Sequence, residues 1–410
     1  MAYTGATTGF AAGAETNASA VDYALETTYN QPPTGAYQAL RYTDCSLAVN
    51  ETESQPDEIN DTPEMAQSVL NGRTTQGSTS GILSAVTYED MLAGVLGADW
   101  TDITIVSTGV ASDSGTFMYQ PDDNIGGNTG CWQISLANNT AEALGIPKSG
   151  VMLLTDSNIN AANLAIPYRA KGSSILVPIG SIPNTTKDGV AASGASLVFN
   201  GITNGKIGKT FTFRKFLSGK WELYSGTMIN QVQITLQKQQ PATISIDLVG
   251  SDLTVSDTDN AASVTPRTST PLIDTVEGFL GCSIFGNAPS GCIQSATLTL
   301  SRDGSGQDTG MGHVGACGVR FGSFKAAMEI TYLFRDYKQF TDWAAGKTGL
   351  VTVSVQGSDG VGYQFAVLNG IIRNPKTPIS GKNQTVVATV SITANPVPGG
   401  GTFAITRVGN

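Results

Sequence analysis

Charged residues are scarce in this sequence. Asp, Glu, Lys and Arg make up 14% of its 410 residues, against roughly 25% in an ordinary soluble domain. The surface is therefore mostly neutral and polar, and such a surface loses little hydration when it packs against a neighbour. The 23 basic residues are outnumbered by 33 acidic ones and form no basic run. This excess of acidic residues argues against a protein that binds nucleic acid tightly, because phosphate binding relies on clustered Lys and Arg.

Histidine is rarer still, since His313 is the only one. A Ser-His-Asp or Cys-His catalytic arrangement would have to use it, and no nucleophile motif accompanies it. A zinc site built from Cys282, Cys292, His313 and Cys317 has poor spacing: nine residues separate the first two cysteines, whereas compact zinc sites use about two to four. The sequence predicts no catalytic residue, no cofactor and no metal.

Long apolar runs are also missing. No stretch approaches the ~18 continuous apolar residues of a membrane helix, so we expect no membrane partner. The amino terminus lacks the basic region and apolar core of a signal peptide. We therefore expect synthesis in a reducing cytoplasm, with reduced and buried thiols at the five cysteines, Cys45, Cys131, Cys282, Cys292 and Cys317.

What the chain has in quantity is two-residue alternation of apolar and polar residues. In Gln231–Leu236 and in Thr243–Leu248 every second residue is aliphatic, the pattern of a strand with one wet face. The same pattern recurs in Thr297–Leu300, Val351–Val355 and Val386–Ile392. We predict a mainly β protein with a few short helices, and its length suggests two domains.

Two short helices are predicted at corresponding places. Thr87 is a suitable N-cap for a helix ending near Gly97, and its apolar stripe is Leu92, Val95 and Leu96. Asp336 can cap a second helix ending at Gly346, with a stripe of Tyr337, Phe340, Trp343 and Ala344.

Around each predicted helix the same order recurs: strand, acidic loop, Gly-Ser strand, helix and two closing strands. This order predicts an internal duplication offset by roughly 245 residues. We expect an N-terminal arm over 1–35, a first module over 36–253 with an outer insertion at about 102–166, a second module over 254–395 and a C-terminal tail over 396–410. The arm lacks a hydrophobic period, so we expect it to be disordered or ordered by a neighbouring subunit.

The order and texture of these segments resemble the tail tube proteins of long-tailed (siphovirus-type) bacteriophages, in particular the subgroup with two tube modules in one chain. The resemblance rests on Glu26–Tyr29 before Pro32 and Pro33, Leu40–Thr43, Ser46–Val49, the acidic Asp57–Ile59, the steps Gly72-Arg73 and Gly77-Ser78, the helix Tyr88–Gly97, and the second module with its closing strand before Pro396.

The resemblance implies two tandem β-sandwich modules, each flanked by one helix, whose inner sheets join edge to edge into a ring-shaped barrel. Stacked rings would form a hollow tube in the virion tail, after synthesis in the host cytoplasm. With two modules a chain, the ring is a trimer with pseudo-six-fold symmetry; a hexameric ring is the alternative. Other tail proteins would contact the tube ends, DNA would pass through the lumen without specific binding, and the arm would reach between rings.

Charged side chains in the predicted loops and on wet strand faces are our candidates for a lumen or ring-stacking surface. An acidic wall repels phosphates and lets DNA slide, although ordinary solvated charge explains the same pattern. The acidic candidates are Glu51, Glu53, Asp57, Glu58, Asp61, Asp303 and Asp308. Three basic candidates near a hairpin, Arg214, Lys215 and Lys220, would meet acidic loops of the next ring.

Two other functions remain open at this point. A β-rich adhesin or receptor-binding protein would expose aromatic platforms, for which Trp100, Trp132 and Trp221 are the first candidates. A β-rich hydrolase is disfavoured by the single histidine and by the absence of a paired-carboxylate motif.

Overall fold

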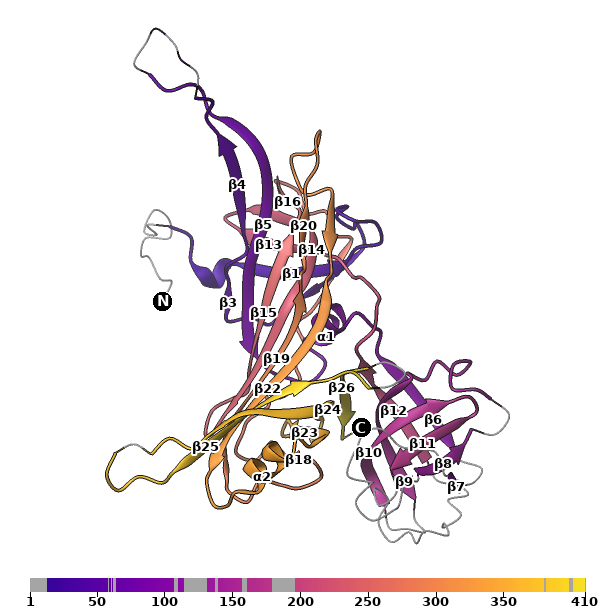
Figure 1. Ribbon diagram of the computed structural model, residues 1–410. Coiled ribbons are helices and arrows are strands. Elements are labelled where there is room, and N and C mark those ends of the chain that lie inside the picture. Colours follow the sequence, from indigo (N-terminus) through magenta and orange to yellow (C-terminus); the bar gives the residue numbers. More distant parts are fainter. Residues whose placement is uncertain are drawn as a thin grey trace, which may run out of the picture.

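The computed structural model describes residues 13–57, 59, 61, 64–106, 110–113, 131–136, 139–156, 161–178, 196–379, 381–397 and 401–409. In these ranges the protein is mainly β, as predicted (Figure 1). Its helices there are α1 (Glu89–Leu96), α2 (Lys338–Ala344) and the single 3-10 turn η1 (Thr16–Ala18).

The largest layer is a sheet of eight antiparallel strands, which runs through the middle of the molecule in Figure 1. Their order across the sheet is β4 (Ala48–Ser54), β5 (Val69–Ile82), β15 (Thr243–Gly250), β14 (Lys220–Gln237), β19 (Ile293–Asp303), β22 (Ser323–Leu333), β25 (Val387–Ala394) and β24 (Gly362–Lys376). The short β3 (Asp44–Cys45) continues the line of β4 along β5. One face of this sheet is buried, because every second side chain is aliphatic.

A second layer covers the buried face. Next to the first four strands it is ordered β17 (Ser263–Thr265), β2 (Ala36–Ala39), β1 (Ala20–Leu25), β13 (Phe211–Leu217), the first half of β14, and β16 (Asp252–Ser256). Next to the last four it is β18 (Phe279–Ile284), β23 (Thr348–Gln356), the first half of β24, and β26 (Phe403–Val408). The strands β14 and β24 therefore take part in both layers.

Two stretches of the chain follow the same plan. The first runs β1, β4, β5, α1, β13, β14, β15, β16, and the second β18, β19, β22, α2, β23, β24, β25, β26. Corresponding strands have corresponding antiparallel partners: β4–β5 matches β19–β22, β5–β15 matches β22–β25, and β14–β16 matches β24–β26. The two sets meet where β14 pairs with β19.

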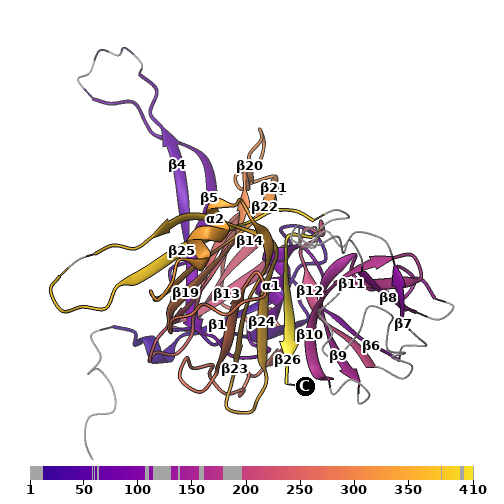
Figure 2. The same cartoon turned by 60° about the horizontal axis from the view of Figure 1, so that its bottom comes forward.

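An inserted subdomain separates α1 from β13 and lies to one side of the sheets in both views (Figures 1 and 2). Its strands are β6 (Thr101–Val106), β7 (Val110–Asp113), β8 (Cys131–Ser135), β9 (Ser149–Asp156), β10 (Ala161–Lys171), β11 (Ser174–Pro178) and β12 (Ser196–Thr203). The insertion thus extends past the predicted end at 166. The subdomain has its own core around Met152 and Phe199. Its strands therefore show the same apolar alternation as those of the main sheets, and only the strand pairing distinguishes the two.

Both chain ends contain structure that the sequence did not predict. The arm expected over 1–35 contributes β1, which pairs with β13 and buries Val21 and Tyr23. The polar Asp22 interrupts the apolar pattern of β1, although it is also buried, opposite Arg214. The tail expected over 396–410 contributes β26, which pairs with both β24 and β12.

The helix starts also differ from prediction. Tyr88, not Thr87, is the N-cap of α1, and the Thr87 hydroxyl instead bonds the Ser84 hydroxyl at 2.7 Å. Gly97 ends α1 in the left-handed conformation at φ 62°, where a residue without Cβ avoids strain. At α2 the Asp336 carboxylate accepts the Lys338 N–H at 3.0 Å, although the N-cap position itself is Tyr337.

Candidate assembly surfaces

The solvent face of the eight-stranded sheet is nearly neutral. It consists of rows of hydroxyl and amide side chains, for example Gln231, Gln233 and Thr235 on β14 opposite Ser301, Thr299 and Thr297 on β19. The charged residues in these rows are Asp44, Asp247, Asp303, Glu329, Lys325, Arg373 and Lys376, and Asp303 pairs with Lys325 at 2.8 Å. Partial burial raises the pKa of the Asp247 carboxyl.

Both outer edges of this sheet are open within the described residues. On one side, β3 and β4 pair only with β5. On the other, residues 372–376 of β24 pair only with β25. Unpaired N–H and C=O groups along a strand are a template for pairing with another chain.

The acidic candidates lie away from the middle of the sheet. Four of them are exposed on the β4–β5 hairpin, which projects from one end of the molecule (Figures 1 and 2). Glu51 and Glu53 lie on β4, and Asp57 and Asp61 lie in the loop that follows it. Glu58 lies outside the described residues. Glu51 is bound to Arg73 at 3.0 Å.

The last two acidic candidates lie at the neighbouring loop. Asp303 ends β19, and Asp308 is on the two-stranded ribbon of β20 (Gly306–Asp308) and β21 (Gly318–Arg320), where it binds Arg320 at 2.9 Å. The ribbon also carries the fully exposed Met311. This second projection points to the same end of the molecule as the β4–β5 hairpin (Figure 1).

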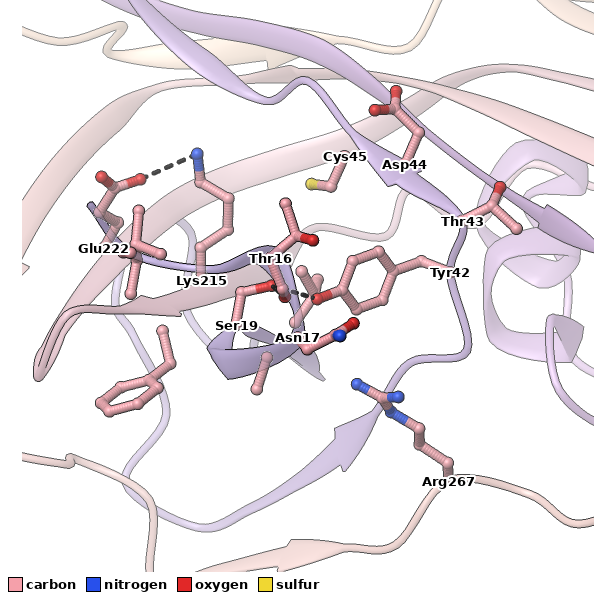
Figure 3. Close-up of a pocket in the computed structure, with 15 residues that line it drawn as sticks. Thr16, Asn17, Ser19, Tyr42, Thr43, Asp44, Cys45, Lys215, Glu222 and Arg267 are labelled. Atoms are coloured by element: carbon pink, nitrogen blue, oxygen red, sulfur yellow. Dashed lines mark hydrogen bonds and ion pairs between the residues drawn. The ribbon is translucent and has the colours of Figure 1, made fainter. Parts of the chain in front are cut away.

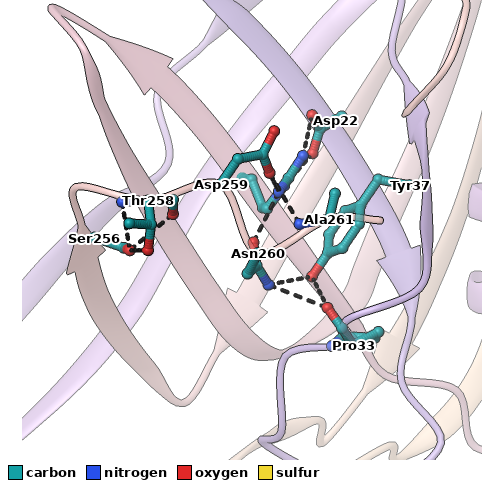
Figure 4. Close-up of polar contacts among 9 residues, drawn as sticks. Asp22, Pro33, Tyr37, Ser256, Thr258, Asp259, Asn260 and Ala261 are labelled. Atoms are coloured by element: carbon teal, nitrogen blue, oxygen red, sulfur yellow. Dashed lines mark hydrogen bonds and ion pairs between the residues drawn. The ribbon is translucent and has the colours of Figure 1, made fainter. Parts of the chain in front are cut away.

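Of the basic candidates, Arg214 is not on the surface at all. Its side chain is 0% exposed, and Nε and Nη2 donate to the two Asp22 carboxylate oxygens at 2.6 and 2.8 Å. Nη1 donates to Asp259 and Asn260, which Figure 4 shows beside Asp22 and Tyr37. The guanidinium stacks 3.9 Å from the Tyr37 ring centroid. Arg214 therefore neutralises a buried carboxylate within its own subunit and cannot meet a loop of another ring.

The other two basic candidates are paired nearby. Lys215 binds Glu222 at 2.9 Å and donates to the Leu47 carbonyl at 2.9 Å. Lys220 is exposed and binds Asp257 at 2.8 Å. Both cations have an acidic partner on the same subunit, so a contact with another ring would have to compete with it.

A second ionic cluster was not predicted from the sequence. Arg407 on β26 binds both carboxylate oxygens of Glu89 at the start of α1, at 2.7 and 2.5 Å, and its Nη1 donates to Asn200 on β12 at 2.7 Å. The Trp100 ring lies 4.4 Å from the guanidinium carbon. This cluster ties the carboxyl-terminal strand to the first helix and to the insertion. Its members are up to 318 residues apart, so no local pattern could have shown it.

The helix α2 presents its aromatic side outward. Tyr337 and Trp343 are 64% and 46% exposed, whereas the polar Gln339 and Asp342 are buried. Gln339 accepts from the Tyr332 hydroxyl at 3.2 Å, and Asp342 binds Lys338 and Lys347, each at 3.3 Å. The predicted apolar stripe therefore lies on one side of α2, but that side does not face the core of this subunit.

A groove of about 540 Å³ lies beside the open β3 edge (Figure 3). Its walls come from three places: the segment around η1, the residues Tyr42–Cys45, and the hairpin residues Lys215 and Glu222. Arg267 closes one side.

The remaining chemical candidates are dispersed. His313 is exposed between β20 and β21, and no group of three or more His, Cys, Asp or Glu among the described residues lies close enough to hold a metal. The expectation of buried thiols is wrong for Cys292 and Cys317, which are exposed, while Cys282 is buried. No helix in the described ranges is long and apolar enough to span a membrane.

Two of the three proposed aromatic platforms, Trp100 and Trp221, are in contact with other side chains of the same subunit. Trp221 stacks on Arg214 at 4.2 Å and packs against Phe216, with ring centroids 4.9 Å apart. Trp100 covers Arg407. The side chain of Trp132 lies outside the described residues. Nothing in these contacts favours an adhesin.

A mainly β protein whose largest sheet ends in two open edges has the architecture of a subunit that assembles with its own copies. The profile of the phage tail tube protein family matches residues 16–394, and the chain therefore belongs to that family. Its role is structural, in the tail tube of the virion through which phage DNA reaches the host. A search of curated proteins finds no match.

Proposed function

We propose that three copies of this chain form one ring of the tail tube. The observation that carries the proposal is the repeated plan of the chain, in which β1–β16 and β18–β26 each contribute four strands to one continuous sheet. We interpret the two stretches as tandem β-sandwich modules. Three chains would supply six modules and a near six-fold barrel, because a closed ring satisfies all strand edges. A ring of six chains is the alternative.

In this ring the hydroxyl and amide rows of the eight-stranded sheet face the lumen. This revises the acidic lining inferred from the sequence, because most of the acidic candidates lie on projections beyond the sheet. A neutral polar wall has few cations that could bind the DNA phosphates and few carboxylates that could repel them. We propose that DNA passes without specific binding and that the subunit catalyses no reaction.

The acidic hairpin between β4 and β5 is our candidate for the contact between successive rings. It projects past the end of the sheet, and its exposed residues combine charge with apolar side chains, of which Ile59 and Met65 are 104% and 79% exposed. Apolar burial would supply most of the contact energy, since exposed ion pairs contribute only about 0–1 kcal/mol each. The remaining partners are other tail proteins at the tube ends.

The test is electron microscopy of the purified chain over a range of concentrations, combined with the mass of any ring. Hollow striated tubes with three chains a ring are the expected result. Six chains a ring would overturn the tandem-module arrangement, and a monomer at every concentration would overturn the assembly itself.

A further inference from the structure

One of the differences between the two modules identifies the surface between subunits. In the first module, residues 231–235 of β14 are paired on both sides, by β15 and by β19. The corresponding residues of β24 are paired on one side only. Conversely, β19 is covered by β14, whereas its counterpart, the line of β3 and β4, is open. The β14–β19 pairing, called here the internal junction, is made within the chain. The strands that would form a second such junction, β24 and the line of β3 and β4, each have one open side and lie at opposite edges of the sheet.

We infer that β24 of one copy pairs antiparallel with the β3–β4 edge of the next copy, in the register of the internal β14–β19 junction. This rests on the proposed ring and specifies which strands close it. The occupant of each edge is a second copy of this chain, because only this chain carries both halves of the junction.

The internal junction supplies a register for this pairing once the two modules are aligned. There, Gln233 lies opposite Thr299. We align Ser391 of β25 with Ser245 of β15; Arg373 then takes the place of Gln233, because each lies opposite that serine. Counting across the two modules in the same way puts Ser46 in the place of Thr299. Arg373 of one copy is then opposite Ser46 of the next.

Burial supports this alignment. It superposes Ile372 on Val232, and Leu47 on Leu300, and all four side chains are at most 1% exposed. A shift by one residue would turn each of these side chains to the wet face. Beyond the bulge at Asn374 and Pro375, the alignment brings Lys376 opposite Asp44, and opposite charges across a strand pair are favourable.

The groove in Figure 3 is in the right position to receive the end of β24. At the internal junction, the last two residues of β14 and the following Lys238 line a small cavity together with Phe279 of β18 and residues 293–296 of β19. The equivalent strands of the first module are β1 and β3, and their residues line the groove of about 540 Å³. Among the described residues of this copy, no strand end occupies the groove as Leu236–Lys238 occupy the small cavity. The segment after β24, where Ile379 is 88% exposed, would enter it.

The outward face of α2 is explained by the same junction. Its counterpart α1 packs against β14 and also against β19 across the junction, where Arg302 Nε donates to the Val95 carbonyl at 2.7 Å. An equivalent placement brings α2 next to the β4 edge of the following copy. The aromatic side chains Tyr337, Phe340 and Trp343 would there be removed from water, which is favourable for large apolar surfaces.

Disulfide trapping tests the register. The variant Ser46→Cys/Arg373→Cys places two thiols directly opposite, where Cα atoms in an antiparallel pair are about 4.5–5.5 Å apart and within disulfide range. The background replaces Cys45, Cys131, Cys292 and Cys317 by Ser. Cys282 is kept, because it is buried and burial raises the pKa of its thiol to about 12, which suppresses its reactivity.

Mild oxidation of assembled tubes should give covalent dimers and trimers on a non-reducing gel, and no larger product. The matched control, Ala48→Cys/Arg373→Cys, moves one thiol two residues, or about 7 Å, along the strand, and should cross-link several-fold less. Tubes in which the control cross-links as well as or better than Ser46→Cys/Arg373→Cys would overturn the register while leaving the proposed function intact. A chain that forms neither tubes nor cross-links would overturn both.

A charge reversal provides a second readout if the cysteine variants assemble poorly. Lys376→Asp should raise the concentration needed for assembly several-fold, because it faces Asp44, and Asp44→Lys/Lys376→Asp should restore it. Equal assembly by the single and the double variant would contradict the pairing.

Discussion

The helices α1 and α2 occupy corresponding positions in the two stretches of the chain that share one plan, yet the apolar side chains of α1 are buried and those of α2 are largely exposed. In α1, Met91, Leu92, Val95 and Leu96 are 0% exposed, whereas in α2 Trp343 is 46% exposed. At the internal junction, α1 is covered by both β14 and β19, whereas α2, at the edge of the sheet, is covered by β24. In the proposed ring, the exposed side of α2 would be covered by the next copy, whereas α1 is already covered within its own subunit.

The largest effect is expected where the first module holds a buried charge. Arg214→Met leaves the Asp22 carboxylate unpaired in the core, and removing one partner of a buried pair costs about 3–5 kcal/mol. The free energy of unfolding, measured by urea denaturation of the subunit, should fall by that amount. The control on the same hairpin is Lys220→Met, whose exposed pair with Asp257 should matter little. Equal stability of the two variants would contradict the structure of the Arg214 cluster.

The helix comparison can be tested directly. Leu92→Ala removes a fully buried side chain of α1 and should lower the free energy of unfolding by about 2–5 kcal/mol. Trp343→Ala in α2 should change subunit stability by less than about 1 kcal/mol but raise the concentration at which tubes form. Denaturation and sedimentation of both variants separate the two effects. A Trp343→Ala subunit that assembles normally would show that α2 is not covered in the ring.

A smaller effect is expected at the β4–β5 hairpin, which projects further from the sheet than its counterpart in the second module (Figure 1). Replacing Glu51, Glu53, Asp57 and Asp61 by their amides leaves the sheet intact and should flatten the dependence of tube length on salt, since salt screens exposed charges. Rings should still form. Tube lengths measured by microscopy across salt concentrations check this. An unchanged salt dependence would mean that these carboxylates do not take part in stacking.

The smallest effect is expected at a single position on the solvent face of the eight-stranded sheet. Asp247 on β15 corresponds to Thr393 on β25, and its raised pKa means that the folded state disfavours the charged form. Asp247→Thr should therefore raise stability at neutral pH, by less than the about 1.4 kcal/mol of a full pKa unit because the side chain keeps contact with water. The gain should vanish as pH falls through the pKa of Asp247, because protonation removes the penalty. Denaturation at several pH values measures it.

Several elements could be read directly from the sequence. The strict alternation in Gln231–Leu236 and Thr243–Leu248 predicted β14 and β15, and their apolar residues are buried as expected. The capping residues and Gly97 located α1 to within two residues. These features are local, since side-chain direction in a strand or a short helix follows from spacing along the chain.

Other elements could not. The arm over 1–35 was predicted to be disordered or ordered by a neighbouring subunit, because it lacks a hydrophobic period. Its strand β1 contains the buried Asp22, whose charge is paired by the distant Arg214. The stripe of α2 was correctly located, but periodicity does not say whether an apolar face meets its own core or a neighbour. The candidates Arg214 and Glu51 are both charged residues of strands, yet one is buried and the other exposed.

The sequence by itself determined the β class, the light charge, the two short helices and the recurring order of segments, because each of these follows from residue type and spacing. The tertiary structure decided which strands are neighbours, which charges are buried and which edges stay open. Those outcomes depend on contacts between residues far apart in the chain, such as the pairing of β14 with β19, and such contacts leave no periodic trace in the sequence.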